Sequence, residues 1–139
     1  MARQVRDILG DLDRLDFAGD YMARLYEVCD ELEDAPDSAT AVEPVLRFIE
    51  RNAERDLGAP GPLVHFIETV SGYEEALLQS LQRLPTDLTV WMLNRILNVA
   101  EDEQRSRYLE LMRSIAGDSA VNRDARDAAL SFLRHQAAS

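Results

Sequence analysis

Lysine is absent from this 139-residue chain, cysteine and tryptophan occur once each, and long apolar runs are missing. A single cysteine, Cys29, excludes an internal disulfide and a zinc site built from cysteines. The apolar runs are too short for a membrane-spanning helix. Acidic side chains at Asp7 and Asp11 interrupt the N-terminal segment before any signal-peptide core. We therefore expect a cytoplasmic protein that has no membrane partner.

The excess of acidic residues restricts the partners that this protein can bind. The net charge is −11, with 15 acidic residues against 7 Arg in residues 1–56 and 11 against 8 in residues 57–139. Phosphate backbones and acidic membranes would repel such a chain, so we expect no direct binding to nucleic acid. A basic protein would be attracted to it. With 46% hydrophobic and 29% charged residues, the composition is that of one globular domain over residues 1–139.

Helical periodicity accounts for nearly the whole chain. The pattern predicts eight helices, over residues 2–15, 20–33, 40–56, 62–71, 73–83, 84–100, 102–116 and 121–136. No segment alternates as a strand does, so the predicted fold class is all-α. The helices form four consecutive pairs of about thirty residues each, which is typical of stacked antiparallel hairpins in a HEAT- or armadillo-like α-solenoid. A compact bundle of the same helices is the alternative.

The stretch 84–100 is the centre of the predicted fold. Thr86 stands where a side chain can cap the first free amides of a helix. The residues that follow are apolar on most faces, which predicts a helix sandwiched between other elements. Asn94 and Asn98 interrupt it and share one face, one turn apart. They indicate either a buried hydrogen-bond ladder to neighbouring helices or a surface that is presented to a partner.

The second helix carries an acidic stripe. Four carboxylates follow helical spacing along one face and a fifth lies close by: Glu27, Asp30, Glu31, Asp34 and Asp37. Like charges at this spacing repel, and acids near a helix C-terminus oppose its dipole. The stripe is either an ordinary solvated face or a docking surface that has been kept at some expense of helix stability.

A second candidate surface follows from the repeat architecture. In stacked hairpins the second helix of each pair usually lines the concave side. This places four polar residues of the fourth and sixth helices on that side: His65, Asn94, Arg95 and Asn98. In the turn between the predicted third and fourth helices, Gly58 suits a left-handed cap at the end of the third helix, and Pro62 suits the first turn of the fourth.

Few residues in the sequence could support catalysis. The chain has two histidines and contains no zinc-protease, phosphate-loop or paired-cysteine motif. Cys29 falls on the core side of its helix, which favours a buried structural thiol over a nucleophile paired with His65. We expect no enzyme activity, no metal and no cofactor.

One segment carries a family resemblance. Residues 58–98 contain the blocks GPLVHFIE and PTDLTVWMLNRI, and the segment resembles a stretch of small bacterial immunity proteins from polymorphic-toxin and contact-dependent inhibition loci. The resemblance implies that the protein binds a cognate toxin C-terminal domain and blocks its active site or substrate entry. We expect a basic toxin domain, and a chain that is a monomer or a 1:1 heterodimer with the toxin. It leaves the toxin open among nucleases, deaminases and ADP-ribosyltransferases. An acidic inhibitor could occupy a basic cleft of such a toxin as a phosphate mimic.

The resemblance also ranks the candidate contacts. Immunity proteins often place specificity on variable surfaces, which favours the acidic stripe first and the concave set second. A HEAT-like scaffold or adaptor that binds another cytoplasmic protein is the alternative function. An enzyme with an atypical site is a third.

Overall fold

The computed structural model describes residues 3–138, and in this range it is entirely helical, so the predicted all-α class is confirmed. Within these residues there are eight α-helices and one short 3-10 helix: α1 (Val5–Asp13), α2 (Tyr21–Asp34), η1 (Ser38–Ala41), α3 (Val42–Arg51), α4 (Gly61–Thr69), α5 (Tyr73–Arg83), α6 (Asp87–Val99), α7 (Asp102–Gly117) and α8 (Arg123–Ala138). Over the same range, no helix has both the length and the hydrophobicity that crossing a bilayer requires.

The chain divides into two units, residues 1–76 and 77–139, with the boundary inside α5. The expectation of a single domain over residues 1–139 stays a prediction, as does the choice between a solenoid and a bundle.

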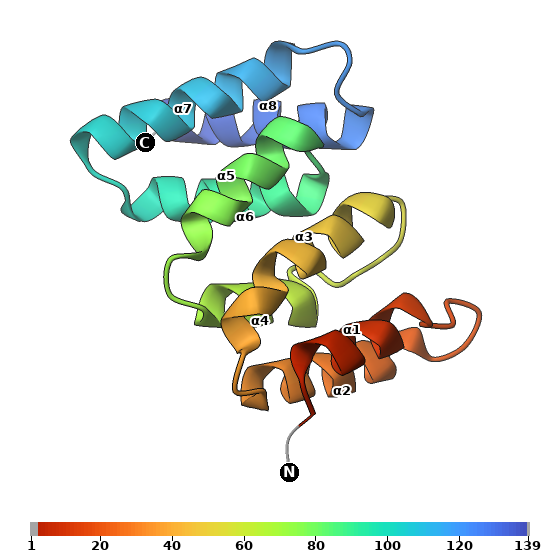
Figure 1. Cartoon of the computed structure of the whole chain (residues 1–139). Helices are drawn as coiled ribbons and strands as arrows, with labels where there is room; N and C mark the ends of the chain where they lie inside the picture. The colour runs from red at the N-terminus through yellow and green to blue at the C-terminus, as the bar shows by residue number, and fades with distance from the viewer. Residues whose placement is uncertain (1–2, 139) are drawn as a thin grey trace. The chain divides into compact units, whose positions relative to one another are not determined.

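The first unit is built around α2. This helix packs against α1 on one side and against α4 on the other, while α3 contacts both α1 and α4 (Figure 1). Apolar side chains recur at helical spacing on the facing sides of these helices, and burying them stabilises the unit. The fully buried large side chains of this unit are Ile8, Leu12, Leu25, Leu32, Leu46, Ile49, Leu63, Phe66 and Ile67.

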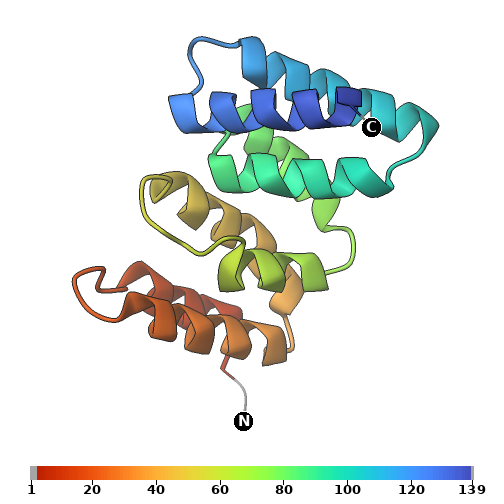
Figure 2. The same ribbon diagram turned by 180° about the vertical axis from the view of Figure 1, so that it is seen from behind.

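The second unit joins α6 to the hairpin of α7 and α8. Helices α6 and α8 pack side by side and run in the same direction (Figure 2). Ala125 and Ala129 of α8 are fully buried, and their small side chains permit close approach. At the start of α8 the Asn122 side chain accepts from the Ala125 amide at 2.9 Å and donates Nδ2 to the Pro85 carbonyl at 2.8 Å. Asn122 therefore links the start of α8 to the segment that precedes α6.

The predicted helix start signals are present. Thr86 caps α6: its Oγ1 accepts from the Thr89 amide at 3.1 Å, and the Thr89 hydroxyl accepts from the Thr86 amide at 3.0 Å. This reciprocal arrangement is a capping box. Pro62 lies in the first turn of α4, as expected. Gly58 has a φ of +103°, in the left-handed region, but it does not cap the third helix as expected, because that helix already ends at Arg51 with Asn52 as its cap.

Two expectations about helix extent and burial were wrong. The third helix ends at Arg51, not at residue 56, and Asn52 is its cap with a φ of −121°. The Asn52 amide and its side-chain Nδ2 both donate to the Phe48 carbonyl, at 3.1 and 2.9 Å, and so close the last turn. Helix α6 is also less enclosed than its apolar pattern predicted. Val99 is 81% exposed and Trp91 is half-buried, so one side of α6 faces solvent.

Candidate functional site

Arginine side chains neutralise part of the acidic stripe on α2. Arg3 donates Nε and Nη2 to the two carboxylate oxygens of Glu31, at 2.9 and 2.8 Å. Arg24 donates Nη1 to Glu27 at 2.9 Å. The hydrogen bonds from Arg3 hold the pKa of the Glu31 carboxyl below its usual range. These two members of the stripe therefore contribute to the first unit's own structure.

The same arginines converge on Asp11 of α1. Its carboxylate accepts from Arg3 at 2.6 Å, from Arg14 at 2.9 Å and from Arg24 at 3.1 Å. The hydrogen bond from Arg3 is the main reason that the pKa of Asp11 lies below its ordinary value. Because Arg3 and Arg24 each also bind a carboxylate of α2, this network fastens α1 to α2.

The remaining three stripe residues differ from one another. Asp37 accepts from the Val5 amide at 3.2 Å and so satisfies a free donor at the start of α1. Asp30 and Asp34 are exposed, and within residues 3–138 neither carboxylate forms an ion pair or accepts a hydrogen bond. Of the five predicted contacts, these two are the carboxylates that stay open to a partner.

A cavity of about 410 Å³ lies beside the stripe, between α2 and the start of α4. From α2 come four side chains at i, i+3, i+4 and i+7, which share one face of the helix. The opposite wall comes from the turn that contains Gly61 and from the first turns of α4. The lining residues are Tyr26, Cys29, Asp30, Glu33, Pro60, Gly61, Pro62 and His65. Asp30 thus belongs both to the stripe and to the cavity, and we name this hollow the α2–α4 cavity.

Cys29 and His65 line the same cavity, but Cys29 is poorly suited to act as a nucleophile. The residue is only 4% exposed, as the sequence predicted. Burial, reinforced by the charges of Asp30 and Glu33, raises the pKa of the thiol to about 12. A thiolate is the reactive form, and it would be scarce at neutral pH. Among the described residues, no group of three metal-ligating side chains is positioned to hold a metal ion. The expected lack of enzyme activity stays a prediction.

His65 lies at the mouth of the α2–α4 cavity. Its Nε2 is 3.4 Å from Glu33 Oε1, and its side chain is 75% exposed whereas that of Glu33 is 30% exposed. The contact is an ion pair only when His65 is protonated. Because the imidazole is on the solvent side, it can move away while Glu33 remains in the cavity wall.

The concave set is divided between the two units. Asn94 and Asn98 belong to the second unit, where the Gln136 side chain of α8 donates Nε2 to both, at 3.1 and 2.7 Å. Gln136 also accepts from Arg105 at 2.8 Å. The asparagines therefore form an interhelical ladder, one of the two alternatives that the sequence left open, although Asn94 is only half-buried and Asn98 is exposed. Their role as partner contacts stays a prediction.

Arg95, on the exposed side of α6, stacks over the ring of Trp91, with the guanidinium carbon 5.2 Å from the ring centroid. This cation–π contact covers part of the half-buried indole. His65 lies in the other unit, and whether these residues share one surface stays a prediction.

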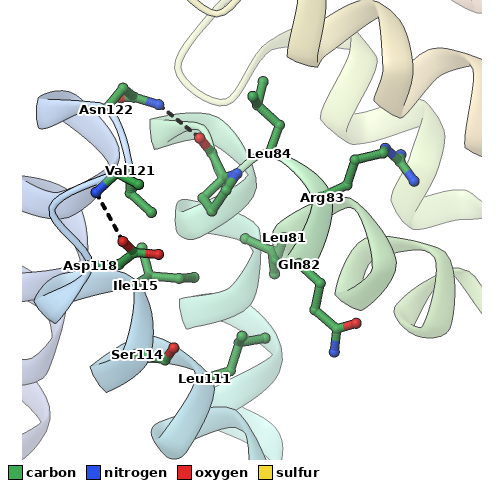
Figure 3. A pocket seen from close by; sticks show the side chains of 12 residues that line it. Leu81, Gln82, Arg83, Leu84, Leu111, Ser114, Ile115, Asp118, Val121 and Asn122 are labelled. Atoms are coloured by element: carbon green, nitrogen blue, oxygen red, sulfur yellow. Dashed lines mark hydrogen bonds between the residues drawn. The ribbon is translucent and has the colours of Figure 1, made fainter.

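The second unit has a cavity of about 480 Å³ beside the end of α5. Figure 3 shows apolar side chains gathered around it, among them Leu81, Leu111 and Ile115. The polar groups at its rim serve the local backbone: Asp118 accepts from the Ala120 amide at 2.9 Å, and Asn122 binds the Pro85 carbonyl. Those two side chains are therefore engaged in shaping the turn. This cavity has one acidic and one basic lining residue, whereas the α2–α4 cavity is lined by two carboxylates and no arginine.

The two units differ completely in net charge. Residues 1–76 contain 18 acidic residues and 7 Arg, which gives −11, while residues 77–139 contain 8 of each and are neutral. The entire net charge of the chain thus belongs to the unit that holds the acidic stripe and the α2–α4 cavity.

Comparison with known proteins assigns no family. No protein-family model matches the chain, and neither the curated proteins nor the solved structures contain a match.

Proposed function

We propose that this protein is an immunity protein that binds a basic toxin domain and blocks its active site or substrate entry in the cytoplasm. The observation that carries the proposal is the location of the whole net charge of −11 in residues 1–76. The resemblance of residues 58–98 to bacterial immunity proteins agrees with it.

The open carboxylates of α2 support a binding role. Asp30 and Asp34 lie in the C-terminal half of α2, and the last turn of that helix contains no basic residue. Carboxylates at this end oppose the helix dipole at about 0.3–1 kcal/mol each. Nearby Glu27 and Glu31 are neutralised by arginines, yet these two are not. A basic partner would supply the missing countercharge.

Electrostatics would also govern how the complex forms. An acidic patch that faces a basic one steers diffusional encounter and raises the association rate by one or more orders of magnitude at low salt. Toxins that act on nucleic acids or nucleotides need a basic cleft for phosphate groups. Carboxylates spaced along α2 would occupy such a cleft in place of phosphates.

The test begins with the protein's own host. A tagged protein is recovered from host lysate at low and high salt and its partners are identified by mass spectrometry. We expect a basic toxin C-terminal domain, encoded beside this gene, in a 1:1 complex that high salt weakens. Co-expression of the two should then restore growth to cells that the toxin alone arrests. Recovery of a housekeeping complex and no rescue would replace the proposal with the scaffold alternative.

A matched pair of variants tests the surface. Asp30→Asn with Asp34→Asn removes two negative charges from the first unit, and Glu103→Gln with Glu110→Gln removes two from exposed positions of the second. We expect the first pair to lower toxin affinity and its salt dependence, and the second to leave both nearly unchanged. Glu31 is unsuitable for this purpose because its loss would also disturb the Arg3 network. Equal effects of the two pairs would exclude α2 as the contact surface.

A further inference from the structure

We propose that the α2–α4 cavity receives an arginine side chain of the protein partner; this inference rests on the proposed function and specifies the chemistry of the contact. Under this proposal α2 does not only attract the partner through its overall negative charge. It also forms one wall of a cavity that binds a single residue of the partner. The occupant follows from the shape of the cavity, its aromatic wall and its charge.

The cavity is a built concavity and not only a group of acids. Its volume of about 410 Å³ falls in the range of sites that enclose small ligands. Rigid proline rings of the turn before α4 form part of the wall that faces α2. Cys29 also lines it and is 96% covered, so this part of the wall is a buried, uncharged thiol.

An aromatic ring and two carboxylates meet in the cavity. Tyr26, Asp30 and Glu33 are spaced i, i+4 and i+7 on α2 and all line it. Tyr26 is 53% exposed, so about half of this residue is open to solvent beside the cavity. Asp30 has no ion-pair partner in the described chain, and the only salt bridge of Glu33 there is the 3.4 Å contact with exposed His65.

A guanidinium group matches this combination better than other cations. It stacks on aromatic rings and donates planar, paired hydrogen bonds to carboxylates, whereas a lysine ammonium is a compact, strongly hydrated charge. A metal ion fits poorly because no three ligating side chains of residues 3–138 converge. Seating an arginine would also neutralise Asp30, which no residue of the described chain does.

The experiment uses a blocked arginine as the probe. N-acetyl-arginine methylamide is titrated into the full-length, 15N-labelled protein, and backbone amide shifts are followed by NMR. The neutral isostere N-acetyl-citrulline methylamide is the control ligand. We expect saturable shifts at millimolar arginine, confined to residues 26–33 and 60–65, and at least about tenfold weaker binding of citrulline, because charge-assisted hydrogen bonds are lost.

Variants separate the cavity from the general charge of α2. Asp30→Asn with Glu33→Gln should weaken binding of the arginine probe about tenfold, while Asp34→Asn with Glu54→Gln, an equal change of charge in the same unit, should alter it less than about twofold. Tyr26→Leu keeps the apolar bulk, removes the ring, and should also weaken binding. Unchanged amide shifts of first-unit residues outside 26–33, 54 and 60–65 show that each variant is folded.

Three results would overturn the inference. They are the absence of saturable shifts, equal binding of the citrulline analogue, or equal losses in the two charge variants. The two proposals can fail separately. If a toxin is neutralised equally well by Asp30→Asn with Glu33→Gln, the cavity has no role although the immunity function stands. If the arginine probe binds as expected and no toxin is neutralised, the cavity assignment stands and the function must be sought elsewhere.

Discussion

Replacing Gly58 by alanine should destabilise the protein more than any other glycine substitution in the turn before α4. Gly58 has a φ of +103°, where an L-residue costs about 1–2 kcal/mol. A Cβ at this position would also lie 2.4 Å from the Gly61 Cα, against a normal carbon–carbon contact of about 3.5–4.0 Å. Because the obstacle is backbone, no side chain can rotate to relieve it. Moving the turn adds about 1–3 kcal/mol, as overpacking does, so we expect a total loss of about 2–5 kcal/mol.

Two other glycines separate these contributions. Gly61 has a φ of +87° but open space at its Cβ position, so Gly61→Ala should lose about 1–2 kcal/mol from backbone strain alone. Gly117 ends α7 with open space and an ordinary φ, and Gly117→Ala should be neutral or slightly stabilising.

Urea unfolding provides the measurement. Far-UV circular dichroism reports helix in both units, while the fluorescence of Trp91, the only tryptophan, reports the second unit alone. The loss in Gly58→Ala should be seen first in the circular dichroism signal, since the turn belongs to the first unit. If Gly58→Ala is no less stable than Gly61→Ala, the collision with Gly61 is not a real constraint and the assigned magnitude is wrong.

Two further predictions concern the thiol and the asparagine ladder. Because burial raises the pKa of Cys29 to about 12, the thiolate fraction at pH 8 is very small, and a disulfide reagent should label the native protein far more slowly than the urea-unfolded chain; equal rates would contradict the buried position. Gln136→Leu removes the donor shared by Asn94 and Asn98 and should lower the free energy of unfolding by about 1–2 kcal/mol. The exposed Gln104→Leu is the control in the same urea assay, and equal changes in the two variants would show that the ladder contributes nothing.

Local signals in the sequence predicted most helix positions. Thr86 caps α6 as expected because capping depends on residues within one turn, although its reciprocal partner Thr89 was not foreseen. The third helix was predicted too long because Asn52 is compatible with either a helix or its end. In the structure Asn52 is the cap of α3, and its side chain donates to the Phe48 carbonyl. The exposure of Val99 depends on what packs around α6, and an apolar pattern carries no such information.

The candidate site could be predicted only in part. The spacing of Asp30 and Asp34 on α2 was readable from the sequence, but the neutralisation of Glu31 was not, because Arg3 lies 28 positions away. The α2–α4 cavity was missed for the same reason: its second wall comes from residues 60–65. Tyr26 and Glu33 were the available signal, since an aromatic residue stands one turn before Asp30 among the acids of α2.

Two hydrogen-bonded contacts between the segments of α6 and α8 fix the residue spacing along α8. Asn122 reaches Pro85, 37 positions earlier, and Gln136 reaches Asn98, 38 positions earlier. The two contacts are therefore separated by nearly the same number of residues in the α6 segment and in the α8 segment. One residue inserted between Asn122 and Gln136 would turn the glutamine by about 100° and shift it by about 1.5 Å, so that only one tie could form. An insertion or deletion that preserves both contacts would therefore have to fall outside residues 85–98 and 122–136, for example in the turn at 100–101.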